Sequence, residues 1–167
     1  WLKVWEVPSG SRGSRGRPIV NMFPLADGEK ITVVLPLTGE ARSFPADRFV
    51  FMGTSMGTVK KTPLDDFSNP RKAGIIAVAL DEGDYLIGAE ITSGTQDIVL
   101  VSDAGKAVWF DEEDVRPMGR TARGVRGMKL GEGQQVLSLL VAANHQETVL
   151  IATENGFGKR TVLADFR

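Results

Sequence analysis

Two short segments alternate arginine with glycine. One reads Arg12-Gly13-Ser14-Arg15-Gly16, and the other reads Arg123-Gly124-Val125-Arg126-Gly127. The guanidinium group of arginine binds phosphate through two parallel hydrogen bonds, and glycine lets main-chain N–H groups come close to the same anion. Nothing in the sequence resembles a DNA-recognition helix, so we expect contacts to a phosphate backbone rather than to base edges.

Basic residues gather in three stretches that contain no acidic residue, at 7–26, 67–80 and 115–131. The formal net charge is −1, so the case for an anionic partner rests on where the charges lie and not on their sum. Acidic residues gather in turns near Gly28 and Gly83 and in the run 111–114. Taken singly, each basic stretch is an ordinary solvated loop. Three of them at equivalent positions of a repeat predict one basic rim and a separate acidic region.

An internal repeat places these stretches. In each unit a glycine turn comes three residues before an apolar run, and a second apolar run ends in another glycine turn. An apolar residue follows at the tenth position after that second glycine, as Phe67, Val115 or Phe166. The first turn glycines are Gly28, Gly83 and Gly133, and the second are Gly57, Gly105 and Gly156. Landmarks in constant order and nearly constant spacing indicate one repeated supersecondary unit.

The apolar runs are short, rich in Val, Ile, Leu and Phe, and separated by Gly, Asp and Asn. No segment keeps a 3.6-residue apolar period, so the sequence predicts strands and hairpins, with strands beginning at Ile31, Leu86 and Val136. Units of roughly 50 residues with about four antiparallel strands are typical of propeller-type blades. A β-solenoid or a meandering sandwich is the alternative. We expect one partial all-β domain over 1–167, with units at approximately 1–30, 31–85, 86–135 and an incomplete 136–167.

Other functional classes have little support. The sequence has no cysteine, which removes disulfides and thiolate chemistry, and it has no apolar run of about 20 residues that could cross a bilayer. The only tyrosine, Tyr85, stands beside a turn, and the only histidine, His145, lies in a predicted loop. We therefore expect no catalytic residue, no cofactor and no metal. The acidic run 111–114 lacks a ligand-spacing pattern and predicts a solvated turn.

Four stretches resemble a known family. They read RGSRGRPIVN at 12–21, GTVKKT at 57–62, TARGVRGMKLGEG at 121–133 and NGFGKRT at 155–161. All four are similar to the C-terminal domain of bacterial DNA gyrase A, and the resemblance extends over essentially the whole chain. The C-terminal domain of the related topoisomerase IV protein is the alternative, and the arginine-glycine run before Pro18 favours gyrase.

This resemblance implies a six-bladed β-pinwheel, a propeller-like disc whose neighbouring blades exchange strands, of which this chain holds a partial set. In the family, the disc wraps duplex DNA around a basic perimeter and supports ATP-dependent negative supercoiling by a type II topoisomerase. The implied partners are duplex DNA, the rest of gyrase A, and gyrase B, in the bacterial cytoplasm without membrane contact. Carried over by position, the implied DNA-binding residues are Arg12, Arg15, Arg17, Lys60, Lys61, Arg71, Lys72, Arg120, Arg123, Arg126, Lys159 and Arg160.

One family motif does not occur in this sequence. The gyrase box, Gln-Arg-Arg-Gly-Gly-Lys-Gly, has only a degenerate echo at 11–17. In the family the box lies upstream of the stretch that begins near Arg12, so we expect it to precede this chain. An incomplete repeat array exposes apolar faces that neighbours would cover, so we expect the fragment to exchange strands or oligomerise. The rival function is a protein-interaction propeller, whose binding would depend little on salt, whereas phosphate binding weakens steeply.

Overall fold

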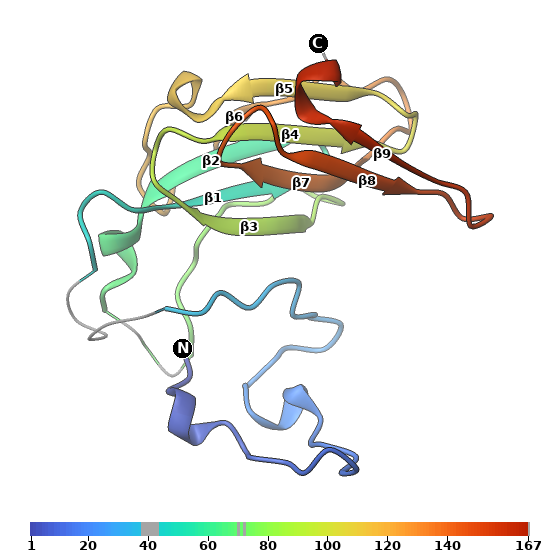
Figure 1. Ribbon diagram of the computed structural model, residues 1–167. Coiled ribbons are helices and arrows are strands. Elements are labelled where there is room, and N and C mark those ends of the chain that lie inside the picture. The colour runs from blue at the N-terminus through green and yellow to red at the C-terminus, as the bar shows by residue number, and fades with distance from the viewer. Residues whose placement is uncertain (38–43, 70, 72, 167) are drawn as a thin grey trace.

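Three antiparallel sheets form the upper part of the molecule in Figure 1. The structure, a computed structural model, describes residues 1–37, 44–69, 71 and 73–166. The first sheet has the strand order β3-β1-β2-β6, the second has the order β5-β4-β7, and the third is the hairpin β8-β9. The strands are β1 (Phe49–Thr54), β2 (Thr58–Pro63), β3 (Leu86–Thr92), β4 (Asp97–Ser102), β5 (Ala107–Asp111), β6 (Val125–Arg126), β7 (Val136–Ala142), β8 (Thr148–Ala152) and β9 (Gly158–Val162). The predicted all-β fold class is confirmed.

The three hairpins β1–β2, β4–β5 and β8–β9 lie where the second apolar runs and their glycine turns predict them. Each hairpin runs into a short 3-10 turn, and these turns are η3 (Leu64–Phe67), η4 (Glu112–Asp114) and η5 (Leu163–Phe166). The first N–H of each turn donates to a carbonyl just before the hairpin. These bonds are 2.9 Å from Leu64 to Arg48, 2.8 Å from Glu112 to Gln96 and 2.8 Å from Leu163 to Glu147. Leu64, Glu112 and Leu163 therefore occupy equivalent positions.

Two of the hairpins receive a further strand from the segment that follows them in the chain. β3 pairs antiparallel with β1, in a register that sets Phe51 opposite Glu90. β7 pairs with β4 in the same way and sets Val99 opposite Leu140. The β1–β3 and β4–β7 pairs thus join residues on the two sides of the expected unit boundaries at 85/86 and 135/136. The boundaries themselves stay a prediction.

Apolar side chains fill the spaces between the sheets. The first and second sheets pack together through Phe51, Ile98, Leu100 and Val136. Val99, Ala142 and Leu163 join the second sheet to the hairpin β8–β9. A further cluster with Val50, Met52 and Leu64 covers the opposite face of the first sheet. The molecule is thus a stack of sheets, each burying side chains toward the next.

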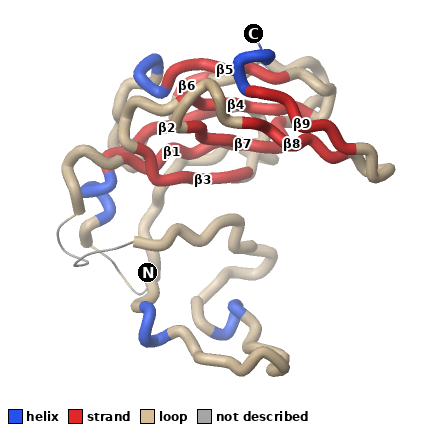
Figure 2. Tube along the Cα trace, viewed as in Figure 1, coloured by secondary structure: helices blue, strands red, loops and turns tan. Residues whose placement is uncertain are grey.

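The N-terminal segment 1–37 runs below the stacked sheets as an irregular chain (Figure 2). It contains two 3-10 turns, η1 (Val4–Glu6) and η2 (Ile19–Asn21). The strand predicted to begin at Ile31 does not form. Within the described residues, 31–37 pairs with no strand, whereas β3 pairs with β1 and β7 pairs with β4. Val33, Leu35 and Leu37 nevertheless pack against the cluster on the first sheet.

A buried carboxylate links the first two sheets. Glu112 is fully buried, although its equivalents in the other hairpins are leucines. Its carboxylate accepts hydrogen bonds from the Thr92 hydroxyl at 2.5 Å and from the main-chain N–H groups of Gly94 and Gln96 at 3.1 and 3.3 Å. Its main-chain oxygen accepts a hydrogen bond from Lys61 Nζ at 2.9 Å. Glu112 thereby holds the β3–β4 connection and touches β2 from the second sheet.

The segment 115–131 lies along the outer edge of β2. β6 pairs with Thr58 and Val59 there, and Gly127 and Met128 both donate to the Gly57 carbonyl. Gly124 has a φ of +109°, and a Cβ at this position would lie 2.6 Å from the Val59 oxygen. Only glycine fits this approach, because any side chain would be both strained and too close to the strand.

Replacing Glu112 with alanine is expected to lower the free energy of unfolding by about 3 kcal/mol, because three donors lose a charged acceptor inside the protein. Glu113→Ala is the matched control, since Glu113 is exposed in the same turn and its loss should change stability by less than about 0.5 kcal/mol. Urea unfolding monitored by tryptophan fluorescence measures both. Equal effects of the two changes would contradict the role given to Glu112.

Gly124→Ala is expected to lower the free energy of unfolding by about 2 kcal/mol, because it imposes a strained φ and pushes β6 away from β2. Gly119 lies in the same segment without a positive φ, and its nearest neighbour to an added Cβ is 4.0 Å away. Gly119→Ala should therefore leave the unfolding midpoint nearly unchanged. A Gly124→Ala protein as stable as the Gly119→Ala protein would show that β6 does not need this close approach.

Candidate nucleic-acid interface

The segment 115–131 alternates buried apolar anchors with exposed cations. Val115, Met118 and Met128 are buried in the cluster between the first two sheets. The Met118 N–H donates to the Lys61 carbonyl at 2.8 Å, and the Met128 N–H donates to the Gly57 carbonyl at 3.1 Å. Around these anchors four cationic side chains are exposed and one, Arg120, is half-buried. The exposed ones are Arg116, Arg123, Arg126 and Lys129.

Two of these arginines contact the neighbouring stretch 76–81. Arg120 Nη1 donates to the Ile76 carbonyl at 3.0 Å, and Arg123 forms an ion pair with Asp81. The Arg123 and Asp81 side chains are 76% and 60% exposed, so water screens the pair and its contribution to stability is small. The expected separation of acidic turns from basic loops is wrong at this place, because the repeat packs one beside the other.

Lys60 and Lys61 were expected on the basic rim, and the structure buries both. Lys60 Nζ donates to the Ala77 carbonyl at 2.7 Å and to the Arg120 carbonyl, and its burial, with a smaller effect from the Arg120 charge, lowers its pKa. Lys61 Nζ donates to the Glu112 carbonyl and lies 5.3 Å from the centre of the Phe49 ring. β2 is covered on both faces, so neither ammonium group reaches the surface.

The other predicted site residues lie on separate exposed stretches. Arg12, Arg15 and Arg17 are exposed in the N-terminal segment, which Figure 1 shows below the sheets, and Arg71 is exposed. Lys159 and Arg160 are exposed on β9. Lys72 lies outside the described residues. Of the predicted set, the structure brings together Arg120, Arg123 and Arg126 on one segment, with Lys60 beneath Arg120.

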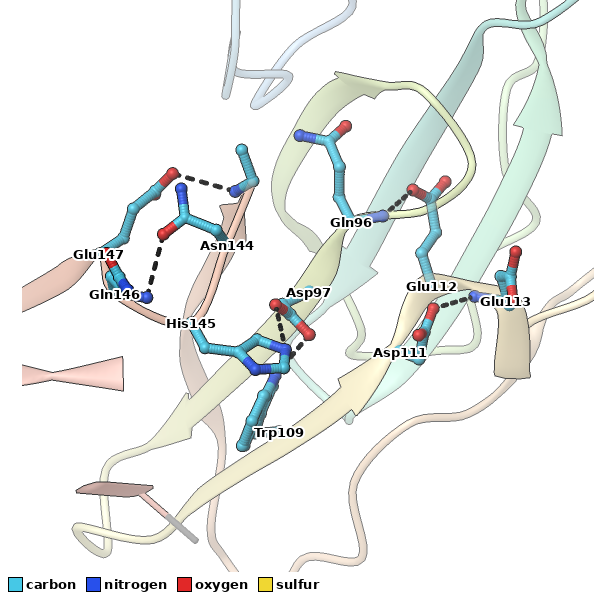
Figure 3. A network of polar contacts seen from close by, with 11 residues as sticks. Gln96, Asp97, Trp109, Asp111, Glu112, Glu113, Asn144, His145, Gln146 and Glu147 are labelled. Carbon is cyan, nitrogen blue, oxygen red and sulfur yellow. Dashed lines mark hydrogen bonds and ion pairs between the residues drawn. The ribbon is translucent and has the colours of Figure 1, made fainter. Parts of the chain in front are cut away.

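A polar contact that was not predicted joins the second sheet to the β7–β8 loop (Figure 3). Asp97 Oδ2 lies 3.0 Å from His145 Nε2, and Asp97 Oδ1 accepts a hydrogen bond from Trp109 Nε1 at 2.9 Å. The Trp109 and His145 rings meet edge to face with centroids 4.7 Å apart. This contact fastens the loop that leads into β8. The spacing of these three residues carries no sequence signal, because the fold alone brings them together.

The other residues that could do chemistry, Tyr85 and the acidic run 111–114, form hydrogen bonds with neighbouring protein groups. The Tyr85 hydroxyl donates to Gln135 Oε1 at 3.0 Å. In the run 111–114, Glu112 points inward and Asp111 accepts from the Glu113 N–H at 2.8 Å, so the predicted solvated turn is wrong for Glu112 alone.

Within the described residues, no three His, Asp or Glu side chains are placed to hold a metal ion. No helix in the same part of the chain is long and apolar enough to span a bilayer.

Known proteins resemble this chain in both sequence and fold. The family model "DNA gyrase C-terminal domain, beta-propeller" matches residues 1–38, 48–93, 96–143 and 147–167. The DNA gyrase A protein of Klebsiella oxytoca is 54% identical over 166 residues, and that of Escherichia coli K12 is 48% identical over 165. Each alignment covers 99% of this chain and 18% of the relative, so the chain spans about a fifth of the length of these proteins.

Solved structures agree with the sequence relatives. The C-terminal domain of DNA topoisomerase IV matches with a TM-score of 0.82 at 30% identity, over 91% of this chain and 46% of that one. A DNA gyrase A C-terminal domain matches with a TM-score of 0.73 at 29% identity, over 90% of this chain and 48% of that one. The resemblance drawn from the four sequence stretches is therefore confirmed, and the chain belongs to the family of DNA gyrase A C-terminal domains.

Proposed function

We propose that this chain binds duplex DNA through the phosphate backbone, without reading base sequence, and that the segment 115–131 is its main contact. The observation that carries the proposal is the anchoring of this segment. Three buried apolar side chains and the pairing of β6 with β2 fix its backbone, while Arg116, Arg123, Arg126 and Lys129 remain exposed. Cations held on a fixed backbone bind a polyanion without a further loss of loop entropy.

The chemistry of the segment suits phosphate. Its cations are mostly arginines, which bind phosphate through paired hydrogen bonds, and no acidic residue occurs within it. Asp81 forms an ion pair with Arg123, and that pair is exposed enough for a phosphate to replace the carboxylate. The exposed arginines at 12, 15, 17, 71 and 160, with Lys159, would extend the path of the DNA over other parts of the chain.

The role in the whole protein follows from the family. Held on a curved basic surface, duplex DNA would bend, at a cost of about 1–6 kcal/mol over 20–30 base pairs that several contacts must offset. As part of gyrase A, acting with gyrase B, the chain would support ATP-dependent negative supercoiling in the cytoplasm. It would hold DNA and take no part in breaking it.

Removing two central arginines tests the interface. In the Arg123→Ala/Arg126→Ala protein, the slope of log affinity against log salt should fall by about 1.8, because each lost phosphate contact removes about 0.9. Fluorescence anisotropy on a linear duplex at several salt concentrations measures the slope. The matched control is Lys30→Ala/Arg48→Ala, which removes the same charge from exposed positions outside the interface. Its salt slope should equal that of the wild-type protein.

Three results would contradict the proposal. They are no binding at low salt, equal slopes for the two double variants, and binding that depends on the base sequence of the duplex. Binding to a protein partner instead would show little dependence on salt, because an apolar interface releases few counterions.

Lys60→Met separates the buried lysines from the interface. The change should lower the free energy of unfolding by about 2 kcal/mol, since the Ala77 and Arg120 carbonyls lose their donor. The salt slope of DNA binding should stay at the wild-type value, because Lys60 is 1% exposed and cannot reach a phosphate. If the slope of log affinity against log salt instead falls by about 0.9 while stability is unchanged, Lys60 contacts a phosphate and belongs to the interface.

A further inference from the structure

An acidic residue of the stretch 76–81 occupies one arginine of the proposed interface. Arg123 Nη1 forms an ion pair with the carboxylate of Asp81. Arg116 and Arg126, which are also exposed on the segment 115–131, form no ion pair within the part of the chain that the structure describes. Arg123 therefore differs from these two arginines in already having an anionic partner.

The repeat itself does not require this ion pair. Asp81 stands two residues before the first turn glycine of its unit, and Gly131 holds that position in the following unit. Arg123 stands ten residues before the turn glycine that follows it, and Ala73 holds the equivalent position in the preceding unit. Neither equivalent has a charged side chain. The pair is thus a feature of this junction and not of the repeated backbone.

A buried lysine holds Asp81 beside the segment 115–131. Lys60 Nζ donates to the Ala77 carbonyl at 2.7 Å and also to the Arg120 carbonyl, so it joins the stretch that ends at Asp81 to the segment that carries the arginines. The Asp81 carboxylate therefore stays close to the interface when another anion approaches. A competitor attached to the same molecule acts at a high effective concentration, because it cannot diffuse away.

The pair is open enough for DNA to displace it. The Arg123 and Asp81 side chains are 76% and 60% exposed, so water surrounds both charges and the pair is weak. A phosphate and the carboxylate would use the same guanidinium N–H groups, and their like charges repel each other at this distance. A phosphate therefore binds Arg123 by displacing Asp81.

We propose that Asp81 lowers the DNA affinity of the segment 115–131 by competing with phosphate for Arg123, an inference that rests on the DNA binding proposed above. In the free protein Arg123 is paired with Asp81, and on binding DNA it exchanges this carboxylate for a phosphate. The exchange strengthens binding less than a phosphate contact to Arg126 does, because one ion pair is lost as another forms. Asp81 thus makes the chain release DNA more readily than its cations alone would allow.

Asp81→Asn tests the competition, because asparagine has nearly the shape of aspartate without its charge. The affinity for a linear duplex, measured by fluorescence anisotropy at low salt, should rise about threefold, which is the scale of an exposed ion pair. Glu82→Gln is the matched control, since it removes the same charge from the next residue, which is exposed and outside the pair. Its affinity should rise by less than about 1.5-fold. Equal rises in the two proteins, or no rise with Asp81→Asn, would overturn the proposal.

A double-mutant cycle shows whether Asp81 acts through Arg123. Arg123→Ala removes the group for which the carboxylate and the phosphate compete, so adding Asp81→Asn to this protein should leave its DNA affinity nearly unchanged. The same rise in affinity in both backgrounds would show that Asp81 repels DNA without involving Arg123. That result would contradict the competition.

Salt and stability measurements separate competition from a change in fold. Raising the salt concentration should bring the DNA affinities of the wild-type and Asp81→Asn proteins together, because salt screens the exposed pair. The urea midpoint should be the same for both, since such a pair contributes little to stability. A lower midpoint together with weaker DNA binding would show that Asp81 supports the interface, and would overturn the proposal.

The same binding data distinguish this inference from the DNA binding on which it rests. If the wild-type protein binds the duplex and Asp81→Asn binds it no more tightly, the competition is wrong and the DNA-binding proposal stands. If neither protein binds at low salt, both proposals are wrong.

Discussion

The open edge of a two-stranded hairpin is the constraint on which this structure depends. A hairpin satisfies the inner main-chain groups of its strands and leaves both outer edges to be paired by another segment. Among the described residues, the added strand comes from later in the sequence wherever one is present, as β3 does for β1, β7 for β4 and β6 for β2. The first two hairpins are therefore each tied to the strand, β3 or β7, that precedes the next hairpin. The connection of neighbouring sheets is a consequence of edge pairing as much as of apolar packing.

The same pairing explains why the cations gather where they do. The segment 115–131 lies on the outer edge of β2 because β6 completes that edge, and Val115, Met118 and Met128 hold it against the core. Between these anchors Arg116, Arg123 and Arg126 are exposed, whereas Arg120 is half-buried. The exposed arginines thus lie on a backbone that is held by its pairing with β2 and by its buried anchors. Lys60 and Lys61 differ because they lie within β2, which other segments cover on both faces.

Much of this architecture could be predicted from the sequence, because short apolar runs and turn glycines encode hairpins locally. The strand expected at Ile31 does not form because a strand needs a partner edge, which is a property of the fold and not of the segment. The two lysines of the GTVKKT stretch have the pattern of surface residues, since nothing local shows that carbonyls from Ala77, Arg120 and Glu112 converge on them. Glu112 could not be predicted for the same reason, as one of four consecutive acidic residues of which only it turns inward.

Glu112 also makes the contact between the first two sheets polar at one point, where it bonds to Thr92 and Lys61. Its equivalents Leu64 and Leu163 are buried among apolar side chains and need no hydrogen-bond donor. A sheet that packed Glu112 against the wrong neighbour would bury a carboxylate away from Thr92, Gly94 and Gln96, at a cost of several kcal/mol. The contact at Glu112 thus tolerates fewer arrangements than an apolar contact would, because the carboxylate needs these three donors in place.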